Sequence, residues 1–406
     1  MSTRGVLISG AGISGPALAY WLRRAGYAVT VVERTDALRA GGYPIDIRGS
    51  AVEVVRRMGI LPRLREAHTG TRRYTFLDTD GATVASLGGA AGHGGGEDGD
   101  LEVRRGDLAE SLYALVRDDV EFRFDDAIDV LDQSGGAGVD VTFRSGARRT
   151  YDLVVGADGM HSQTREGLFG PEERFRRDLG YSFAVFTVPN TSRLSRELVM
   201  WNSPGRAAAL YALGEDDPPH AFLTFHQTFH RPDPPHDALR DPDAFRDPDA
   251  CREVFARVFA DAGGEVPRLL DAMRHADDLF CDTAAQIRMP RWSSGRVALV
   301  GDAAHAPSFL TGQGSSLALA GAYVLAHALA GHREHPAALA AYERGLRGFV
   351  TANQALVDDG GARLFPTTPA ALERRDAVLR GLDAMPSMTT HPAHTALTLP
   401  PPPGGR

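Results

Sequence analysis

The sequence predicts an α/β fold in which a Rossmann-like nucleotide-binding domain is interrupted by an antiparallel β-sheet domain and followed by C-terminal helices. The first observation is a βαβ pattern, because β-branched runs at 5–9 and 28–33 flank a stretch with helical spacing at 15–25. The second is a change of texture over 181–227, where short segments alternate apolar and polar residues, as antiparallel strands do. The third is a return of the parallel-strand pattern at 297–300, which makes the middle of the chain an insertion.

The composition is ordinary for a globular protein, and 406 residues are enough for two domains. The net charge of -8 and the lack of a dense Lys/Arg block give no reason to expect a nucleic-acid partner. Two cysteines, Cys251 and Cys281, are too few for a disulfide framework or a Cys-rich metal site. We therefore expect a reducing cytoplasm and no metal. We see neither a signal peptide nor an apolar segment long enough to span a bilayer, so no membrane partner is expected.

The expected nucleotide-binding domain is discontinuous and consists of residues 1–72, 98–175 and 280–335. The β-sheet domain, which would bind the substrate, should consist of residues 73–97 and 176–279. Helical spacing then continues over 336–385. The remaining tail, 386–406, is rich in proline and is expected to be disordered or extended.

Gly10, Gly12 and Gly15 fit the pattern GxGxxG between a strand and a helix. The first glycine allows a tight turn, the second lets a pyrophosphate approach the backbone, and the third allows close helix–strand packing. The helix that begins near Ser14 directs free N–H groups and the positive end of its dipole toward the phosphates. This segment therefore predicts a dinucleotide site.

The residues after the second strand support that prediction. Glu33 ends the strand, where a carboxylate can accept hydrogen bonds from two ribose hydroxyls. Arg34 would support the adenine or phosphate end of the ligand, and its alternative is a solvated neighbour of Glu33.

A second glycine-rich segment lies far downstream. Asp302 follows a buried strand and is expected to bind a ribityl or ribose hydroxyl, unless it only caps a helix. Gly312, Gly314 and Ser315 open another helix, whose N-terminus would stabilise a second anion. One ligand that touches both segments must be an extended dinucleotide.

Together with Val-Gly-Ala-Asp-Gly at 155–159, these two segments resemble class A flavoprotein monooxygenases, the family of para-hydroxybenzoate hydroxylase, polyketide-tailoring hydroxylases and tetracycline-inactivating monooxygenases. The three motifs cover most of residues 4–330. The resemblance implies non-covalent FAD and a transient NADPH or NADH co-substrate. It further implies hydroxylation of an aromatic or polycyclic small molecule by O2 through a flavin C4a-hydroperoxide, as in the tailoring of secondary metabolites. We expect a monomer or homodimer.

The resemblance also assigns roles to residues between the motifs. Asp46 and Arg48 would lie close to the flavin, and Arg48 is also a candidate catalytic residue. Arg105 resembles the arginine that contacts the ribityl and phosphate region. Asp158 resembles an acid that helps to bind FAD and the nicotinamide cofactor, although it could act mainly by holding its own turn.

One position departs from the family pattern. Many relatives have one or two prolines just before Gly-Gln-Gly, beside the place where oxygen reacts, whereas this chain has Ser308 and Phe309. Phe309 is a candidate catalytic residue that would narrow the oxygen pocket, gate the substrate or simply pack. This difference keeps other reactions open: an FAD-dependent oxidase, a reductase or a Baeyer–Villiger-type oxygenase. A non-enzymatic FAD-binding scaffold is a further alternative.

Most of the candidate substrate contacts lie on the β-sheet domain. Phe222, Thr224 and His226 share one face of a strand by period two, but the pattern does not tell which face lines the substrate cavity. His226 is a candidate base for a phenolic substrate, and its alternative is an exposed or core histidine. Gln286, on a later strand, is expected to reach the substrate or the flavin.

Overall fold

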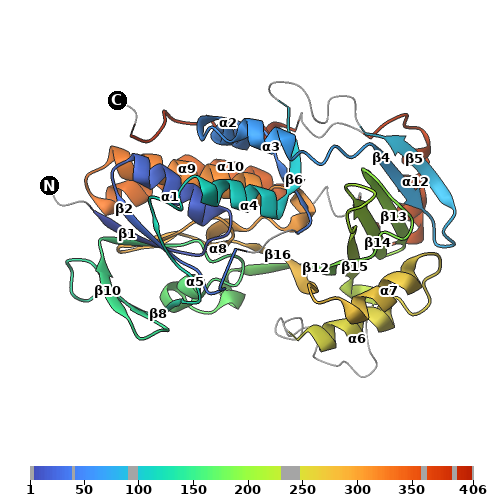
Figure 1. The fold of residues 1–406 in the computed structure, drawn as a ribbon, viewed down its shortest axis with the longest axis horizontal. Helices are drawn as coiled ribbons and strands as arrows, with labels where there is room; N and C mark the ends of the chain where they lie inside the picture. The colour runs from blue at the N-terminus through green and yellow to red at the C-terminus, as the bar shows by residue number, and fades with distance from the viewer. Residues whose placement is uncertain are drawn as a thin grey trace.

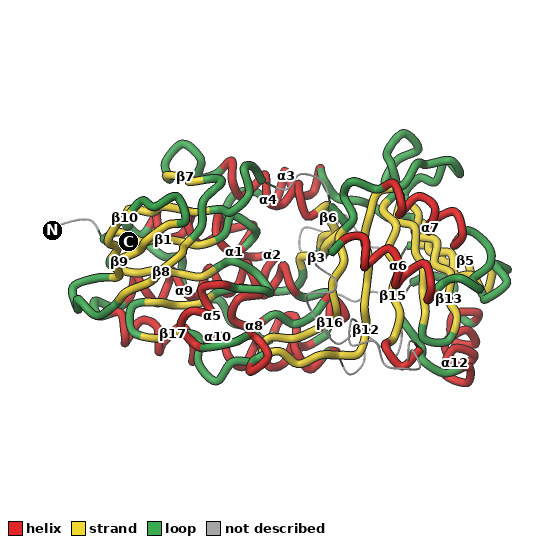
Figure 2. Tube along the Cα trace, turned by 90° about the horizontal axis from the view of Figure 1, so that it is seen from below, coloured by secondary structure: helices red, strands yellow, loops and turns green. Residues whose placement is uncertain are grey.

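The computed structural model describes residues 4–38, 42–89, 99–229, 247–357, 364–385 and 391–404. Two bodies lie side by side, and the long strands β12 and β16 run from one to the other (Figures 1 and 2). The α/β fold class with an inserted, largely antiparallel sheet is thereby confirmed.

The nucleotide-binding body is built on a six-stranded sheet. Its order is β17 (Ser293–Ser294), β18 (Val297–Leu299), β11 (Leu153–Gly156), β1 (Gly5–Ser9), β2 (Ala28–Val32) and β7 (Glu121–Arg123). All pairs are parallel except β17 with β18. The strands are apolar because both faces are covered. Val6 and Ile8 face a core shared with helices, while Leu7 faces a small second sheet.

Figure 1 shows the helices on one face of this sheet and the small sheet on the other. The helices that supply the core are α1 (Ser14–Arg24), α2 (Ser50–Arg57), α3 (Leu61–Glu66), α4 (Arg105–Ala114), α9 (Gly314–Gly331) and α10 (His335–Ala355). The small sheet contains β8 (Ile128–Asp132), β9 (Val139–Phe143) and β10 (Arg148–Tyr151). Two further short helices, α5 (Gln163–Phe169) and α8 (Asp302–His305), follow strands β11 and β18.

The second body is a seven-stranded sheet. Its order is β16 (Phe280–Ile287), β12 (Arg176–Thr187), β15 (His220–His226), β14 (Arg206–Ala212), β13 (Glu197–Ser203), β4 (Arg73–Leu77) and β5 (Thr83–Gly88). Neighbours are antiparallel except β13 and β4, which run parallel. Helices α6 (Pro248–Val258) and α7 (Val266–His275) cover one face (Figure 2). Helix α12 (Pro369–Arg380) packs against β5 at the far edge.

Two boundaries differ from the expectation. Strand β16 was assigned by sequence to the nucleotide-binding domain, but it pairs with β12 at the edge of the seven-stranded sheet. The prediction of disorder in the tail is wrong for residues 391–404, which lie against the nucleotide-binding body. Their carbonyl groups accept hydrogen bonds from side chains, as Leu397 O does from Ser50 Oγ (2.8 Å) and Pro400 O from Tyr323 Oη (2.7 Å). Proline lacks an N–H but keeps its carbonyl, so a proline-rich segment can be held in this way.

The cysteines and the most apolar helix also differ from the expectation. Cys251 on α6 and Cys281 on β16 form a disulfide, so the cysteine count no longer argues for a reducing compartment. The sequence showed no apolar segment long enough to span a bilayer, but helix α9 meets the length and composition of a membrane span. However, 78% of it is buried within the protein, as in a core helix.

Candidate active site

The turn after β1 admits only glycine at two of its positions. Gly10 has a φ of +106°, and a Cβ there would lie 2.5 Å from the carbonyl oxygen of Ala157. A Cβ on Gly15 would lie 1.9 Å from the carbonyl oxygen of Gly10, so helix α1 starts in direct contact with the turn. A Cβ on Gly12 would come within 3.8 Å of Arg105 Nη2. The Arg105 guanidinium makes no hydrogen bond or ion pair with other described residues, so its charge is available to a phosphate.

Glu33 is tied to the same turn. Its Oε2 accepts a hydrogen bond from the amide of Ala11 (2.8 Å), and its Oε1 accepts one from the amide of Thr35 (3.1 Å). The carboxylate therefore stands at the end of β2 beside the glycine turn and keeps acceptor capacity for ribose hydroxyls. Arg34 is exposed next to it.

The two glycine segments touch one another. A Cβ on Gly301 would lie 2.0 Å from Ser14 Oγ, at the first residue of α1. The next residue, Asp302, accepts no hydrogen bond on its carboxylate within the described part of the chain. Burial raises the pKa of the Asp302 carboxyl, and the positive charge of Arg105 opposes that rise.

The third part of the site surrounds the N-terminus of α9. Gly312 has a φ of +64°, and a Cβ there would lie 3.0 Å from Asp46 Oδ2. Asp46 is ion-paired with Arg48 (2.8 Å), and the amide of Arg48 donates to Ser316 Oγ (3.0 Å). The segment that carries Asp46 and Arg48 is thus held against the turn that precedes α9. Ser315 is buried within the first turn of that helix.

Unsatisfied atoms show that these residues fit an extended cofactor. Both polar atoms of the Gln313 amide and the Nε of Arg48 are buried without a hydrogen-bond partner among the described residues. A Cβ on Gly314 would meet no atom within 4 Å, so the helix N-terminus opens into free space. The N-termini of α1 and α9, the Arg105 guanidinium and the Asp302 carboxylate match the phosphates and sugar hydroxyls of FAD.

Asp158 holds its own turn, which is the alternative that the sequence left open beside a cofactor contact, and the cofactor contact stays a prediction. Its Oδ1 accepts from Ser162 Oγ (2.5 Å), and its Oδ2 accepts from the amide and the hydroxyl of Thr164 (3.0 and 2.9 Å). These bonds hold the turn before α5. Since a Cβ on Gly10 would come within 3.0 Å of the Asp158 Cα, the carboxylate supports the phosphate turn from behind.

An aromatic cluster joins the two bodies. The ring centroid of Phe309 lies 4.7 Å from that of Phe183 and 5.4 Å from that of Phe222. The rings of Phe222 and Phe309 also lie beside the ring of Phe365. Phe222 and its period-two neighbours therefore occupy the sheet face opposite α6 and α7, and that this face lines the substrate cavity stays a prediction. Because Phe309 belongs to the turn that ends at Gly312, the aromatic cluster lies beside that turn.

The other predicted substrate residues have mixed surroundings. His226 stacks edge-on against Tyr181, binds Thr228 Oγ1 through Nδ1 (2.7 Å), and burial lowers its pKa. The hydroxyl of Thr224 is buried and donates to the Ser182 carbonyl (2.9 Å). The Gln286 amide is fully buried and donates to the Pro307 and Gln354 carbonyls. The Thr224 hydroxyl and the Gln286 amide are therefore hydrogen-bonded within the protein, and a direct contact with the substrate does not fit either group.

Two networks were missed by sequence reasoning. His161 binds Glu172 (3.0 Å) and Asp282 (3.4 Å), and these hydrogen bonds, with Asp282 first, raise its pKa to about 9. Glu102 gathers three hydroxyl donors beside Arg48. Neither is visible in the sequence, because each joins segments that meet only in the folded chain. The motif before His161 was the one available signal.

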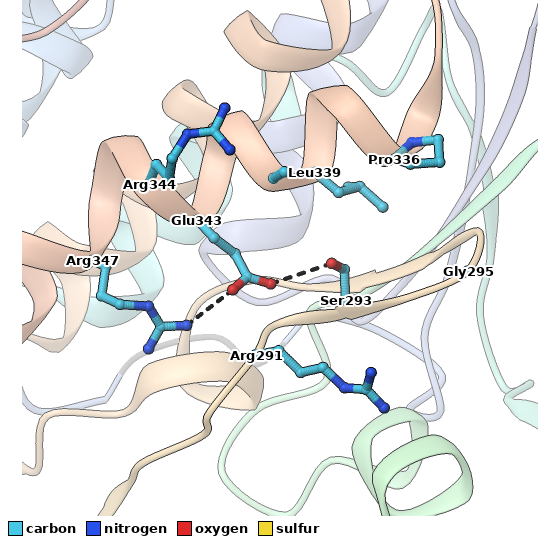
Figure 3. Close-up of a pocket in the computed structure, with 9 residues that line it drawn as sticks. Arg291, Ser293, Gly295, Pro336, Leu339, Glu343, Arg344 and Arg347 are labelled. Carbon is cyan, nitrogen blue, oxygen red and sulfur yellow. Dashed lines mark hydrogen bonds and ion pairs between the residues drawn. The ribbon is translucent and has the colours of Figure 1, made fainter.

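A surface pocket of about 520 Å³ lies elsewhere, between α10 and the turn that joins β17 to β18 (Figure 3). Its Glu343 carboxylate binds Arg347 (3.0 Å) and the amide of Trp292 (2.6 Å). None of the predicted site residues lines it.

The geometry and the sequence relatives agree. Residues 3–355 match the family described as FAD binding domain, and the chain belongs to this family. It is an FAD-dependent monooxygenase of the class A type. A flavin-dependent monooxygenase from an unknown prokaryotic organism is 35% identical over 384 residues, which cover 94% of this chain and 96% of the relative. An uncharacterized protein of Mycobacterium tuberculosis is 42% identical over 362 residues, 88% of this chain and 94% of that protein. The crystal structure of tetracycline destructase Tet(55) has a TM-score of 0.83 and 32% identity, with 98% of each chain covered.

Proposed function

We propose that this protein hydroxylates an aromatic or polycyclic small molecule with O2 and NADPH or NADH. One oxygen atom becomes the product hydroxyl, the other becomes water, and NAD(P)H with one proton supplies the hydrogen that this water requires. We also propose that the reaction tailors a secondary metabolite in the cytoplasm, with the protein as a monomer or homodimer.

The aromatic cluster is the observation that carries this proposal. Phe309 lies in the turn just before Gly312, and its ring contacts the rings of Phe222 and Phe183 on the seven-stranded sheet. Aromatic rings bind planar apolar molecules by offset or edge-on stacking. A planar substrate held against this cluster would lie between the sheet and the second cofactor segment. The relative Tet(55) is named for action on tetracycline, a polycycle, which supports this substrate class.

The remaining roles are divided between the two segments. When bound, FAD supplies hydride acceptance and oxygen activation. We assign the phosphates to the Gly10 turn and Arg105, a sugar hydroxyl to Asp302, and the flavin end to the N-terminus of α9. His226 is neutral near pH 7 because burial lowers its pKa, so it is able to accept a proton from a phenol. The sheet above the flavin end would exclude water.

Oxygen labelling tests the proposal. The FAD-loaded protein is incubated with tetracycline, NADPH or NADH, and oxygen-18 gas, and the product is examined by mass spectrometry. We expect one labelled oxygen atom in the product and substrate-stimulated oxidation of the nicotinamide. Product without label would refute hydroxylation by O2.

An oxidase, reductase or Baeyer–Villiger-type reaction is the second candidate. Ser308 has a φ of +77°, which is rare for a residue with a Cβ. Phe309 stands where the family resemblance implies a proline. This altered turn changes the surroundings of the reacting oxygen. Hydrogen peroxide in amounts equal to the O2 consumed would favour the oxidase, and ring expansion with label would favour the Baeyer–Villiger reaction.

A further inference from the structure

Glu102 is a largely buried acid for which the proposed reaction gives no role. It stands on β6 (Leu101–Arg104), which pairs antiparallel with β3 (Pro44–Ile47), and its direct cross-strand partner is Asp46. Like charges directly opposite one another on paired strands repel. Asp46 is already ion-paired with Arg48, so two carboxyl groups share one guanidinium.

Three hydroxyl groups converge on one oxygen of Glu102. Thr69 Oγ1 (2.6 Å), Thr71 Oγ1 (3.1 Å) and Tyr211 Oη (3.1 Å) all donate to Glu102 Oε2. Tyr211 belongs to β14 of the seven-stranded sheet, so these bonds connect the two bodies. Hydrogen bonds of this kind favour the carboxylate, whereas burial and a nearby negative charge favour the protonated acid.

The charged and titratable groups that interact with Glu102 or with Arg48 come from β3, β4, β14 and the segments before β4 and β6. They are Asp46 and Arg48 on β3 and the following loop, Asp100 before β6, His68 before β4, Tyr74 on β4 and Tyr211 on β14. Arg48 is the one permanent cation in this set. Burial and the charge of Asp46 raise the pKa of the Glu102 carboxyl. Asp46 and Arg48 neutralise each other. An ionised Glu102 therefore adds one uncompensated negative charge beside this pair, and a protonated Glu102 adds none.

This change takes place beside the second cofactor segment. Asp46 Oδ2 is 3.0 Å from the position that a Cβ on Gly312 would occupy, and the amide of Arg48 binds Ser316 on α9. A charge on Glu102 therefore acts on the Gly312 turn through Asp46 and Arg48, in surroundings that water screens poorly.

We propose that Glu102 is a proton-holding positioning residue of the flavin site. It gains or loses one proton, and the Asp46–Arg48 pair transmits the change of charge to the turn before α9. The step is a proton transfer between solvent and Glu102 Oε2 and involves no oxidation. The inference rests on the part of the proposed function that places the flavin end at this turn, and it is independent of hydroxylation.

The test follows the visible absorption and fluorescence of bound FAD between about pH 5 and pH 9, above the ordinary pKa of a glutamate. Wild-type protein should show a one-proton transition, and Glu102→Gln, which keeps the shape of the side chain, should abolish it. Tyr211→Phe removes one donor to the charged form, so its transition should move upward by roughly half a pH unit to one unit.

The matched control is Glu121→Gln. Glu121 also accepts a hydroxyl hydrogen bond, from Thr30 (3.1 Å), but it lies on β7 at the edge of the six-stranded sheet. Its substitution should leave the transition unchanged. A wild-type spectrum without a transition, or a transition that persists in Glu102→Gln, overturns the proposal.

If Glu102→Gln does not fold, an unmoved transition in Tyr211→Phe overturns it equally. The titration contains no substrate, NAD(P)H or turnover, so a failure of the proposed hydroxylation would not affect its outcome.

Discussion

Replacing Asp302 with asparagine should weaken FAD binding and at the same time stabilise the protein without FAD. The carboxylate accepts no hydrogen bond within the described part of the chain, and burial raises its pKa. It is therefore unfavourable in the free protein and becomes favourable only when a sugar hydroxyl donates to it. Asparagine removes the charge, keeps the shape and retains one weaker acceptor.

The size of the effect follows from the hydrogen bond. A bond to a charged group contributes about 1.5–3 kcal/mol, and the amide oxygen of asparagine recovers part of it. We expect a loss of about 1.5 kcal/mol, or roughly tenfold in the dissociation constant of FAD. The stability of the free protein has the opposite sign. A carboxyl whose pKa is raised by folding destabilises the fold when ionised, so the advantage of Asp302→Asn exists above about pH 4 and vanishes below it.

Two measurements check this prediction. Fluorescence titration of the apoprotein gives the dissociation constant, and thermal unfolding from about pH 3 to pH 8 gives the stability. The exposed Asp129→Asn serves as the control and should change neither. An Asp302→Asn protein that binds FAD like the wild type and unfolds more easily would refute the reasoning, because the carboxylate would then be a structural cap.

Three further predictions concern stability. His161→Gln should lower the free energy of unfolding by about 3 kcal/mol near pH 6, because a histidine pKa raised from 6.5 to about 9 stabilises the fold below pH 6.5. In denaturant titrations the difference from wild type should disappear as the pH rises through about 9, and an equal loss at about pH 10 would contradict this prediction. Reduction of the Cys251–Cys281 disulfide, whose cysteines are separated by 30 residues, should lower the stability of the sheet body by about 3–4 kcal/mol in guanidinium unfolding with and without dithiothreitol. The control variant Cys281→Ser should be insensitive to the reductant. Ser308→Gly should raise the unfolding free energy by about 1 kcal/mol because it relieves the positive φ, and a lower melting temperature would count against strain at this turn.

Features determined by short-range sterics were predictable from the sequence. Gly15 is required because a Cβ there would strike the carbonyl oxygen of Gly10 within the same βαβ unit, and Gly10 is required by its positive φ in that turn. The period-two pattern placed Phe222, Thr224 and His226 on a common face, but only the packing of Leu223 and Phe225 against α6 and α7 showed that this common face lies on the other side of the sheet.

Features that depend on register or on distant contacts were not predictable. The pairing of Asp46 with Glu102 requires the register of β3 and β6, and a shift by one residue would separate them. The disulfide requires α6 to lie on β16. Asp158 matches its motif in sequence, yet its hydrogen bonds to Ser162 and Thr164 became evident only from the turn before α5.

The central claim is that one FAD molecule is held by both the Gly10–Gly15 turn and the segment from Gly301 to Gly314. Calorimetric titration of the apoprotein with FAD, and separately with FMN, tests it most directly, because FMN lacks the adenosine monophosphate end. We expect one FAD per chain and much weaker binding of FMN. Equal affinity for the two flavins would contradict the account, since the first glycine turn would then contribute nothing to holding the cofactor.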